Sequence, residues 1–264
     1  MPKPACPSCS YTRFWNVRRG RRKCARCRRE WTPGVHVAAG VRATRGEWRE
    51  VIAVFLERRT VVDAATRTSV GRSRAAKMVA HLREQMAIDQ PSGFTGPVEI
   101  DETYIGGRRK NQRLHIRERY LPKRGHGTQK LPIIGALDRG TGTVRVEVMA
   151  RKLDRHIVLD FVRRTAVSGS RVFTDGFPYY RDLAGLGYRH ERVDHSAGEY
   201  VRGIVHANGI EGFWGFMKRT MGTVGGMRRE RLGYFAGEIA WRYNHRNHDQ
   251  KTKERALLQL VLGG

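Results

Sequence analysis

Three acidic side chains lie where strands and a helix could bring them together. Asp101 follows the apolar start of the segment VEIDETYIGG, and Asp175 ends the apolar segment VFTDG just before a turn. Glu211 lies in HANGIEGFWGFMKR, whose apolar residues recur at helical spacing and leave Glu211 on another side. Two strands and one helix can therefore direct Asp101, Asp175 and Glu211 into one cleft.

Three carboxylates in one cleft would repel one another at neutral pH unless hard cations lay between them. Two Mg²⁺ ions (or Mn²⁺) about 3.5 to 4 Å apart could activate a water or a 3′ hydroxyl and stabilise the leaving oxygen of a phosphodiester. The sequence therefore predicts that Asp101, Asp175 and Glu211 form a catalytic metal site. Glu99 shares the strand face of Asp101 and could support it, whereas Glu102 is expected on the opposite face as a surface or supporting residue.

The four cysteines form two matched pairs, Cys6-x-x-Cys9 and Cys24-x-x-Cys27. In each pair a tight turn lets two thiolates point at one ion, so the pattern predicts one structural Zn²⁺ held by four sulfurs at about 2.3 Å. Two disulfides or a redox pair are the alternatives. A cytosolic chain argues against the first, and the presence of two matched pairs argues against the second. We expect a zinc ribbon over residues 1–45.

The predicted ribbon is strongly basic, because residues 1–45 contain twelve Lys or Arg and a single acid, Glu30. Over the whole chain 51 Lys and Arg stand against 25 Asp and Glu, a formal charge of +26. Such a charge needs a polyanion to neutralise it, which indicates nucleic acid as the partner. Trp15 and Trp31 are expected in the ribbon core rather than against a base.

The composition favours a folded cytoplasmic protein. The chain has 264 residues, of which 39% are hydrophobic, enough for one sizeable core and one or two small modules. It contains no apolar stretch of the kind found in a signal peptide or a membrane span, so secretion and membrane insertion gain no support. Charge alone does not distinguish an enzyme from a ribosomal or chromatin-type binding protein.

Residues 46–90 have the pattern of three short helices. Apolar residues recur at i, i+3, i+4 and i+7 from Trp48, a second helix is expected at 61–67, and RSRAAKMVAHLREQM predicts a third after the turn TSVG. This order resembles a helix-turn-helix whose last helix enters the major groove of DNA. The alternative is a small helical linker with a solvated basic face. In the first case the expected DNA contacts are Arg72, Arg74 and Lys77.

After the Gly- and Pro-rich segment DQPSGFTGP, strands and helices alternate over residues 97–250. Strands are expected at 97–105, 131–138, 143–149, 171–174 and 188–193. Helices are expected at 154–166, from Pro178, at 208–221 and at 228–246. Three strands followed by alternating helices and strands are the order of a ribonuclease H-like core, an α/β fold with a mixed sheet. Residues 251–264 are expected to form a C-terminal helix or tail.

A basic insertion, residues 106–130, interrupts this predicted domain. Its segment GRRKNQRLHIRERYLPKRGHGTQK carries nine Lys or Arg and one acid. The insertion is too polar for a core and too long for an ordinary hairpin, so it is expected to lie on DNA phosphates. Acids would then hold the metals, and basic residues would hold the DNA that those acids repel. Within the insertion the expected DNA contacts are Arg108, Arg109 and Lys110.

Four segments, VEIDETYIGGR, VFTDGFPYY, HANGIEGFWGFMKR and AWRYNHRN, resemble the DDE-type transposases of bacterial insertion sequences that carry an N-terminal zinc ribbon. The likeness covers nearly the whole chain, and DETY-x-GG and N-x-IE-x-FW are its most specific strings. It implies that Asp101, Asp175 and Glu211 are the metal-binding triad. It also implies that Lys218 is the basic residue that follows the acid on its helix, and Arg219 is expected beside it at the DNA.

The resemblance implies magnesium-dependent nicking at the 3′ ends of a mobile element and transfer of those ends into target DNA in the bacterial nucleoid. A homodimer or higher multimer would hold both ends, and the ribbon and helix-turn-helix would recognise the terminal inverted repeats. Some relatives use an asparagine as the third ligand, so Asn208 is an alternative, and His206 is a further candidate near the site. Two other functions stay open: a transposase-derived DNA-binding regulator without catalysis, and a structure-selective nuclease.

Overall fold

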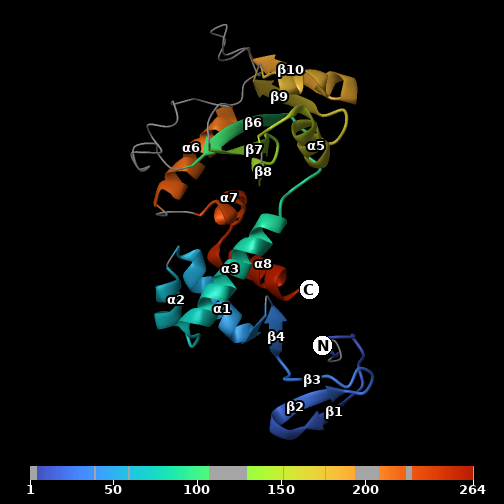
Figure 1. The fold of residues 1–264 in the computed structure, drawn as a ribbon, viewed down its shortest axis with the longest axis vertical. Coiled ribbons are helices and arrows are strands. Elements are labelled where there is room, and N and C mark those ends of the chain that lie inside the picture. Colours follow the sequence, from blue (N-terminus) through green and yellow to red (C-terminus); the bar gives the residue numbers. More distant parts are fainter. Residues whose placement is uncertain are drawn as a thin grey trace. The chain divides into compact units, whose positions relative to one another are not determined.

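The computed structural model describes residues 5–38, 40–58, 60–106, 130–150, 152–175, 177–193, 208–223 and 228–263. The chain forms two compact units, one made of residues 1–82 and 248–264 and the other of residues 83–247. Figure 1 labels most of the helices and strands of both units. None of the helices in the described segments is both long enough and apolar enough to cross a membrane.

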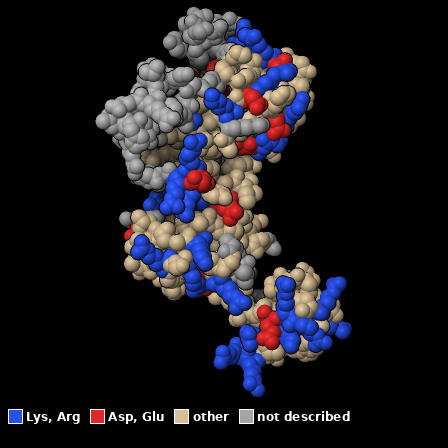
Figure 2. All heavy atoms as spheres, in the orientation of Figure 1, with Lys and Arg blue, Asp and Glu red and all other residues tan. Residues whose placement is uncertain are grey.

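The first unit begins with a small antiparallel sheet. Its strands are β1 (Phe14–Val17), β2 (Arg21–Cys24) and β3 (Glu30–Trp31), and a short turn, η1 (Arg18–Gly20), joins the first two. A two-stranded hairpin follows, formed by β4 (Val35–Ala38) and β5 (Val41–Thr44). Lys and Arg are far more numerous than acids on the visible face of this module in Figure 2.

The two tryptophans of the ribbon lie in different environments. Phe14 packs edge-on against Trp31, with ring centroids 5.6 Å apart. Trp15, the next residue on β1, is 48% exposed. Successive side chains of a strand point to opposite faces, so Trp15 turns outward when Phe14 turns inward. The prediction that Trp15 belongs to the ribbon core is therefore wrong.

The helices of the first unit are α1 (Arg45–Leu56), α2 (Val61–Arg67), the first part of α3 (Arg72–Ile88) and α8 (Gln250–Leu262). A capping box starts α1, since the side chains of Thr44 and Glu47 each accept the backbone N–H of the other residue. Thr60 and Asp63 start α2 in the same way. The final helix of the chain, α8, packs on α1, whose Trp48 is fully buried.

The second unit contains a five-stranded mixed sheet. Its strands are β6 (Val98–Ile105), β7 (Leu131–Asp138), β8 (Thr143–Val148), β9 (Arg171–Asp175) and β10 (Arg189–Val193). They lie in the order β10-β9-β6-β7-β8; β6, β7 and β8 form an antiparallel meander, and β9 and β10 add to the other edge in parallel. The ribonuclease H-like order expected from the sequence is confirmed.

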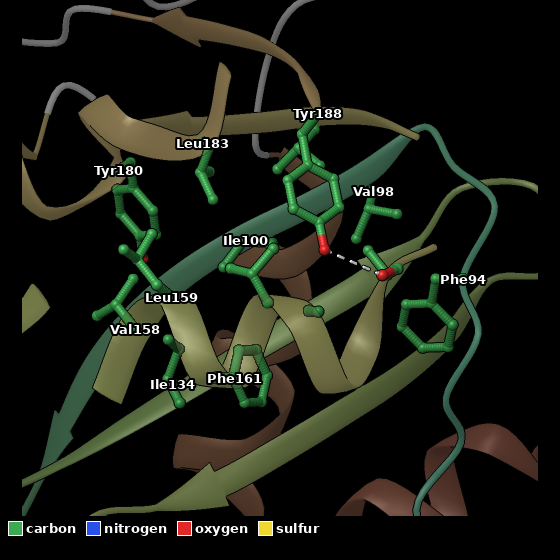
Figure 3. Packing of buried hydrophobic residues seen from close by; sticks show 14 of the residues in the cluster. Phe94, Val98, Ile100, Ile134, Val158, Leu159, Phe161, Tyr180, Leu183 and Tyr188 are labelled. Carbon is green, nitrogen blue, oxygen red and sulfur yellow. Dashed lines mark hydrogen bonds between the residues drawn. The ribbon is translucent and has the colours of Figure 1, made fainter. Parts of the chain in front are cut away.

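Helices cover both faces of this sheet. One face packs against α5 (Arg155–Thr165) and the 3-10 helix η4 (Pro178–Leu186), with Ile100 and Phe161 fully buried between them, as Figure 3 shows. The other face packs against α6 (Asn208–Thr223) and α7 (Leu232–Asn244), the latter preceded by η6 (Arg229–Arg231). Strand β6 lies in the middle of the sheet, so its side chains reach both layers.

Candidate active site and metal centre

Asp101 lies on the face of β6 that is covered by α6. The indole Nε1–H of Trp214, on α6, donates a 2.9 Å hydrogen bond to Asp101 Oδ2. The residue paired with Asp101 on β7 is Gly135, and a Cβ at Gly135 would lie 2.5 Å from Cη2 of Trp214. Gly135 therefore leaves the space that the indole needs to reach the carboxylate.

Glu99, two residues before Asp101 on the same face, fastens the start of α6. Its Oε2 accepts the backbone N–H of Ile210 at 2.8 Å, and its Oε1 accepts from Nε of Arg139 at 2.6 Å. The Glu99 side chain is 1% exposed and that of Arg139 is 19% exposed, so the accepting carboxylate is buried while the guanidinium reaches the surface. A Cβ at Gly209 would come within 2.9 Å of Glu99 Oε2, which explains why a glycine occupies that helical position.

Glu211 follows Ile210 directly, in the first turn of α6, and its side chain is exposed. Asp175 is the last residue of β9, where its Oδ1 accepts the backbone N–H of Phe177 at 3.1 Å. That bond closes the turn leading into η4. Asp101, Asp175 and Glu211 thus come from three different elements, β6, β9 and α6.

The charges of Asp175 and Glu211 act on the carboxyl group of Asp101. Burial and the nearby Asp175 carboxylate raise the pKa of Asp101 to about 6, and Glu211 adds to the rise, while the Trp214 N–H opposes it. A carboxyl group whose pKa is raised by two other carboxylates lies within their electrostatic field. The negative charges of Asp175 and Glu211 therefore lie close enough to Asp101 to affect its ionisation.

Glu102 lies on the opposite face of β6, and the charges of Asp175 and Asp101 affect it as well. Its pKa is raised to about 8 by burial, then by Asp175 and by Asp101. The hydroxyl of Tyr180, a fully buried residue of η4, donates a 2.8 Å hydrogen bond to Glu102 Oε2. Strand alternation predicted the opposite face correctly, but the alternative of a surface position is wrong because η4 covers this carboxyl group.

Among the described residues, the four cysteines are the only group of three or more acidic, His or Cys side chains close enough to hold a metal ion, with ligand atoms that all lie within 4.8 Å of one another. The carboxylates share an electrostatic field without meeting at that distance. One oxygen of Asp101 is engaged by Trp214, and one oxygen of Asp175 is engaged by Phe177. Carboxylate oxygens of this kind are the ligands that a hard cation prefers.

The cysteine cluster has the dimensions of a zinc site. All four are free thiols, and the Sγ atoms of Cys6 and Cys27, and of Cys9 and Cys24, are 3.6 Å apart. A tetrahedron with Zn–S bonds of about 2.3 Å has edges of about 3.8 Å, so one Zn²⁺ fits between them.

Backbone N–H groups favour the thiolate form in this cluster. The N–H groups of Arg26 and Cys27 point at Cys24 Sγ, at 3.3 and 3.5 Å. Burial by itself raises the pKa of Cys24, but these bonds and those with the thiols of Cys9 and Cys27 lower it to about 6, while the neighbouring thiols raise the pKa of Cys27 to about 11. Since a zinc ligand must be deprotonated, the local backbone prepares Cys24 for the metal.

The residues predicted to contact DNA differ in how exposed they are. Arg74 is engaged within its own unit, because it donates to Glu47 at 2.7 Å and to the carbonyl oxygen of Arg42 at 2.8 Å. Arg72, Lys77, Lys218, Arg219 and the alternative ligand Asn208 are exposed. Arg108, Arg109, Lys110 and His206 lie outside the described residues.

Residues 93–244 match the ISXO2-like transposase domain. The chain belongs to this family. The match includes Asp101, Asp175 and Glu211 together with the residues that contact them, whereas the cysteine cluster and α1 lie outside it. The family membership inferred from the sequence strings is confirmed.

One relative of this ISXO2-like chain is an "Uncharacterized protein in transposable element ISH50" from the archaeon Halobacterium salinarum, 37% identical over 155 residues. The alignment covers 55% of this chain and 52% of the relative, so the chain spans about half the relative's length. A cryoEM structure of a simian T-cell lymphotropic virus intasome with the PP2A regulatory subunit B56 gamma aligns with 80% of this chain and 67% of that chain, at 11% identity and a TM-score of 0.31. Similarity at that level does not bear on function.

Several residues that support the site of this transposase-family chain were not identified from the sequence. Helical spacing marks Trp214 only as one of the apolar residues of HANGIEGFWGFMKR, although a buried indole N–H usually needs a hydrogen-bond partner. Nothing in the sequence distinguishes Tyr180 and Gly135 from other residues of their type, because their importance depends on which residues the fold brings opposite them. Arg139, which neutralises Glu99, follows a strand end where a charged turn residue is ordinary.

Proposed function

We propose that the protein is a transposase that binds the terminal inverted repeats of its element, cleaves at the 3′ ends and joins them to target DNA. Asp101, Asp175 and Glu211 would hold two Mg²⁺ (or Mn²⁺) ions. The observation that carries this proposal is that β6, the end of β9 and the first turn of α6 provide Asp101, Asp175 and Glu211 within a domain of a transposase family, with the Trp214 bond to Asp101 joining β6 to α6. Carboxylates from three neighbouring elements are suited to a divalent metal.

When bound, the divalent ions supply Lewis-acid activation of the attacking oxygen and stabilise the leaving oxygen. The chain's own residues position the ligands. Trp214 orients Asp101 from α6, and Glu99 fixes the residue directly before Glu211. Lys218 and Arg219, exposed two turns further along the helix, are suited to neutralise phosphates next to the site.

The substrate in this proposal is double-stranded DNA in the cytoplasm, at the nucleoid. The formal charge of +26 supports it, because phosphate contacts by Lys and Arg release counterions from DNA. The basic ribbon and the exposed Arg72 and Lys77 of α3 would contact the element's ends. A homodimer or higher multimer follows from the reaction, since two ends must be held together while they are joined to the target DNA.

The decisive experiment combines purified protein, Mg²⁺ and labelled duplexes that carry the element's ends. Wild type should nick the 3′ ends and join them to a second DNA. D101N should bind the same duplexes with similar affinity but give no nicked or joined product. D160N is the matched control, because Asp160 is a 63% exposed residue of α5 with an ion pair to Arg164. It should behave as wild type.

Each of the other outcomes would indicate a different function for this protein. Binding without any product from wild type would indicate the regulator. Cleavage of branched DNA that lacks the element's ends, without joining, would indicate the nuclease. Strand transfer by D101N at the wild-type rate would refute the assignment of Asp101.

A further inference from the structure

An aromatic–cation pair lies at the surface of the ribbon. The guanidinium carbon of Arg28 lies 5.0 Å from the ring centroid of Trp15, which is 48% exposed. Lys23 lies directly opposite Trp15 in the antiparallel register of β1 and β2, so both side chains project from the same face. A large apolar ring therefore lies at the surface with a guanidinium over it.

The turn that carries Arg28 does not need an arginine. Arg28 follows Cys27 directly and has a φ of +62°, with its N–H bonded to the carbonyl oxygen of Cys24 at 3.1 Å. Ser10 holds the equivalent place after the first cysteine pair, with a φ of +57°. Glycine adopts this left-handed conformation without steric cost. The zinc-binding turn explains the backbone geometry, and the arginine side chain calls for another explanation.

The surroundings of the pair favour a polyanion. From Cys6 to Trp31 the sequence contains nine Lys or Arg and one acid. That acid, Glu30, is ion-paired with Arg21 at 3.1 Å. The basic side chains of the ribbon are visible as blue spheres in Figure 2. An exposed indole among so many positively charged side chains is better suited to contact a nucleic acid than an apolar protein surface.

We propose that Trp15 and Arg28 form a single contact to the DNA backbone, in which Arg28 binds a phosphate and the indole packs on the adjoining deoxyribose. A guanidinium stacked on an aromatic ring keeps its in-plane N–H donors, which can bind phosphate oxygens in pairs. Stacking also restricts both side chains before DNA arrives, which lowers the entropy lost on binding. This inference rests on the proposed function, since DNA is the substrate there.

The test uses the full-length zinc-loaded protein and a fluorescent duplex, with affinity measured over a range of salt concentrations. R28G should lower the slope of log K against log salt by about 1, the loss of one phosphate contact. Because glycine relieves the left-handed backbone, R28G should retain zinc and melt no lower than wild type, so weaker binding would not reflect unfolding. W15L should weaken binding by roughly tenfold with little change in slope.

R26Q is the matched control for R28Q. Arg26 is an exposed arginine on the same cysteine turn, and its replacement removes the same charge. R28Q should weaken binding several times more than R26Q. Equal effects would overturn the proposal, because charge alone would then explain binding. So would wild-type affinity in W15L and R28G, a shift of W15L in oligomeric state rather than in DNA affinity, or tighter binding of an RNA duplex than of DNA.

These outcomes separate the two proposals. If W15L and R28G bind as wild type while wild type still joins DNA ends, the transposase assignment stands and only the backbone contact is refuted. If wild type binds no duplex at all, both are refuted.

Discussion

Trp214 and Asp101 are 113 residues apart in the chain, and a 2.9 Å hydrogen bond joins the indole N–H of one to the carboxylate of the other. Trp214 lies three residues after Glu211 on α6, so this bond connects the strand that carries one proposed ligand with the helix that carries another. The N–H also lowers the pKa of Asp101, against the rise caused by burial, Asp175 and Glu211. The contact therefore affects both the position and the charge of Asp101.

The first prediction concerns W214F, which keeps most of the ring packing and removes the N–H. The pKa of Asp101 should rise above its wild-type value of about 6, because a group that favours the charged form is lost. The acidic limb of the pH–rate profile for strand cleavage should move to higher pH. At pH 7 the rate should fall roughly tenfold or more, the effect of losing one hydrogen bond to a charged group.

W241F is the control for this change. Trp241 is 1% exposed on α7, and within the described residues its Nε1 has no hydrogen-bond partner. The substitution removes a similar volume from the same unit but no hydrogen bond. W241F should lower stability through lost packing, yet its pH–rate profile should match that of wild type. Equal shifts in both variants would show that lost packing, rather than the N–H, controls Asp101.

The second prediction concerns the buried pair of Glu99 and Arg139. E99Q keeps an acceptor for the N–H of Ile210 but leaves the guanidinium of Arg139, on a side chain 19% exposed, without its buried counter-charge. Unfolding free energy should fall by about 2 to 3 kcal/mol, less than for a fully buried pair. A double-mutant cycle with R139Q in urea unfolding should show a coupling of about 1 to 3 kcal/mol. Additive effects would mean that the two side chains act independently.

The third prediction compares two glycines of α6 that are three residues apart. A Cβ at Gly209 would meet Glu99 Oε2 at 2.9 Å and Leu137 Cδ2 at 3.2 Å, whereas a Cβ at Gly212 would meet nothing within 4 Å. G212A should raise the unfolding free energy by about 0.5 to 1 kcal/mol, the usual gain of alanine over glycine in a helix. G209A should lower it by about 1 to 2 kcal/mol and slow strand transfer, because the start of α6 must shift.

Thermal melting and single-turnover strand transfer on the same preparations would measure both effects. A stable and fully active G209A would show that the contact between Glu99 and the helix start tolerates an extra methyl group. Crowding by the Glu99 carboxylate would then no longer explain the glycine at position 209.

The sequence predicted the elements well because their signals are local. Strand β7 begins and ends at the expected residues, Leu131 and Asp138, since its apolar residues are bounded by turn residues. The contacts that orient the carboxylates depend on distant pairing. Gly135 matters only because β7 places it opposite Asp101, across an insertion of the chain. Alternation gave the correct face for Glu102, but Tyr180 covers it from an element 78 residues away. Composition and spacing do not contain that information.

The fourth prediction is a pH dependence of stability that comes from Glu147. Burial alone would raise the pKa of Glu147, but hydrogen bonds from Arg164 and Arg145, both at 2.7 Å, outweigh burial and lower it. A carboxyl group whose pKa is lowered by folding stabilises the protein above its unfolded pKa of about 4.3, and that contribution is lost as pH falls through the folded value. E147Q should therefore be less stable than wild type at pH 7, with the difference shrinking below about pH 4.

Urea unfolding of both proteins at several pH values would measure this difference. E230Q, which alters an exposed residue of η6, should remain as stable as wild type throughout. A difference between E147Q and wild type that stayed constant down to about pH 3, below the unfolded pKa, would mean that packing, rather than ionisation of Glu147, stabilises the contact.

The fifth prediction separates the ribbon from the catalytic sheet by removing zinc. The four cysteines lie in the first unit, while Asp101, Asp175 and Glu211 lie in the second. Folding of such a small module is coupled to its metal, so a strong chelator should release one Zn²⁺ per chain, unfold the ribbon and weaken DNA binding. Hydrogen exchange in β6 and β7 should change little, because each unit has its own core.

C24S should reproduce the chelator's effect without chelator, since Cys24 is both a proposed ligand and the buried centre of its turn. Unchanged DNA affinity after complete zinc loss would show that the ribbon takes no part in binding, and loss of protection in β6 would show that the two units do not fold independently.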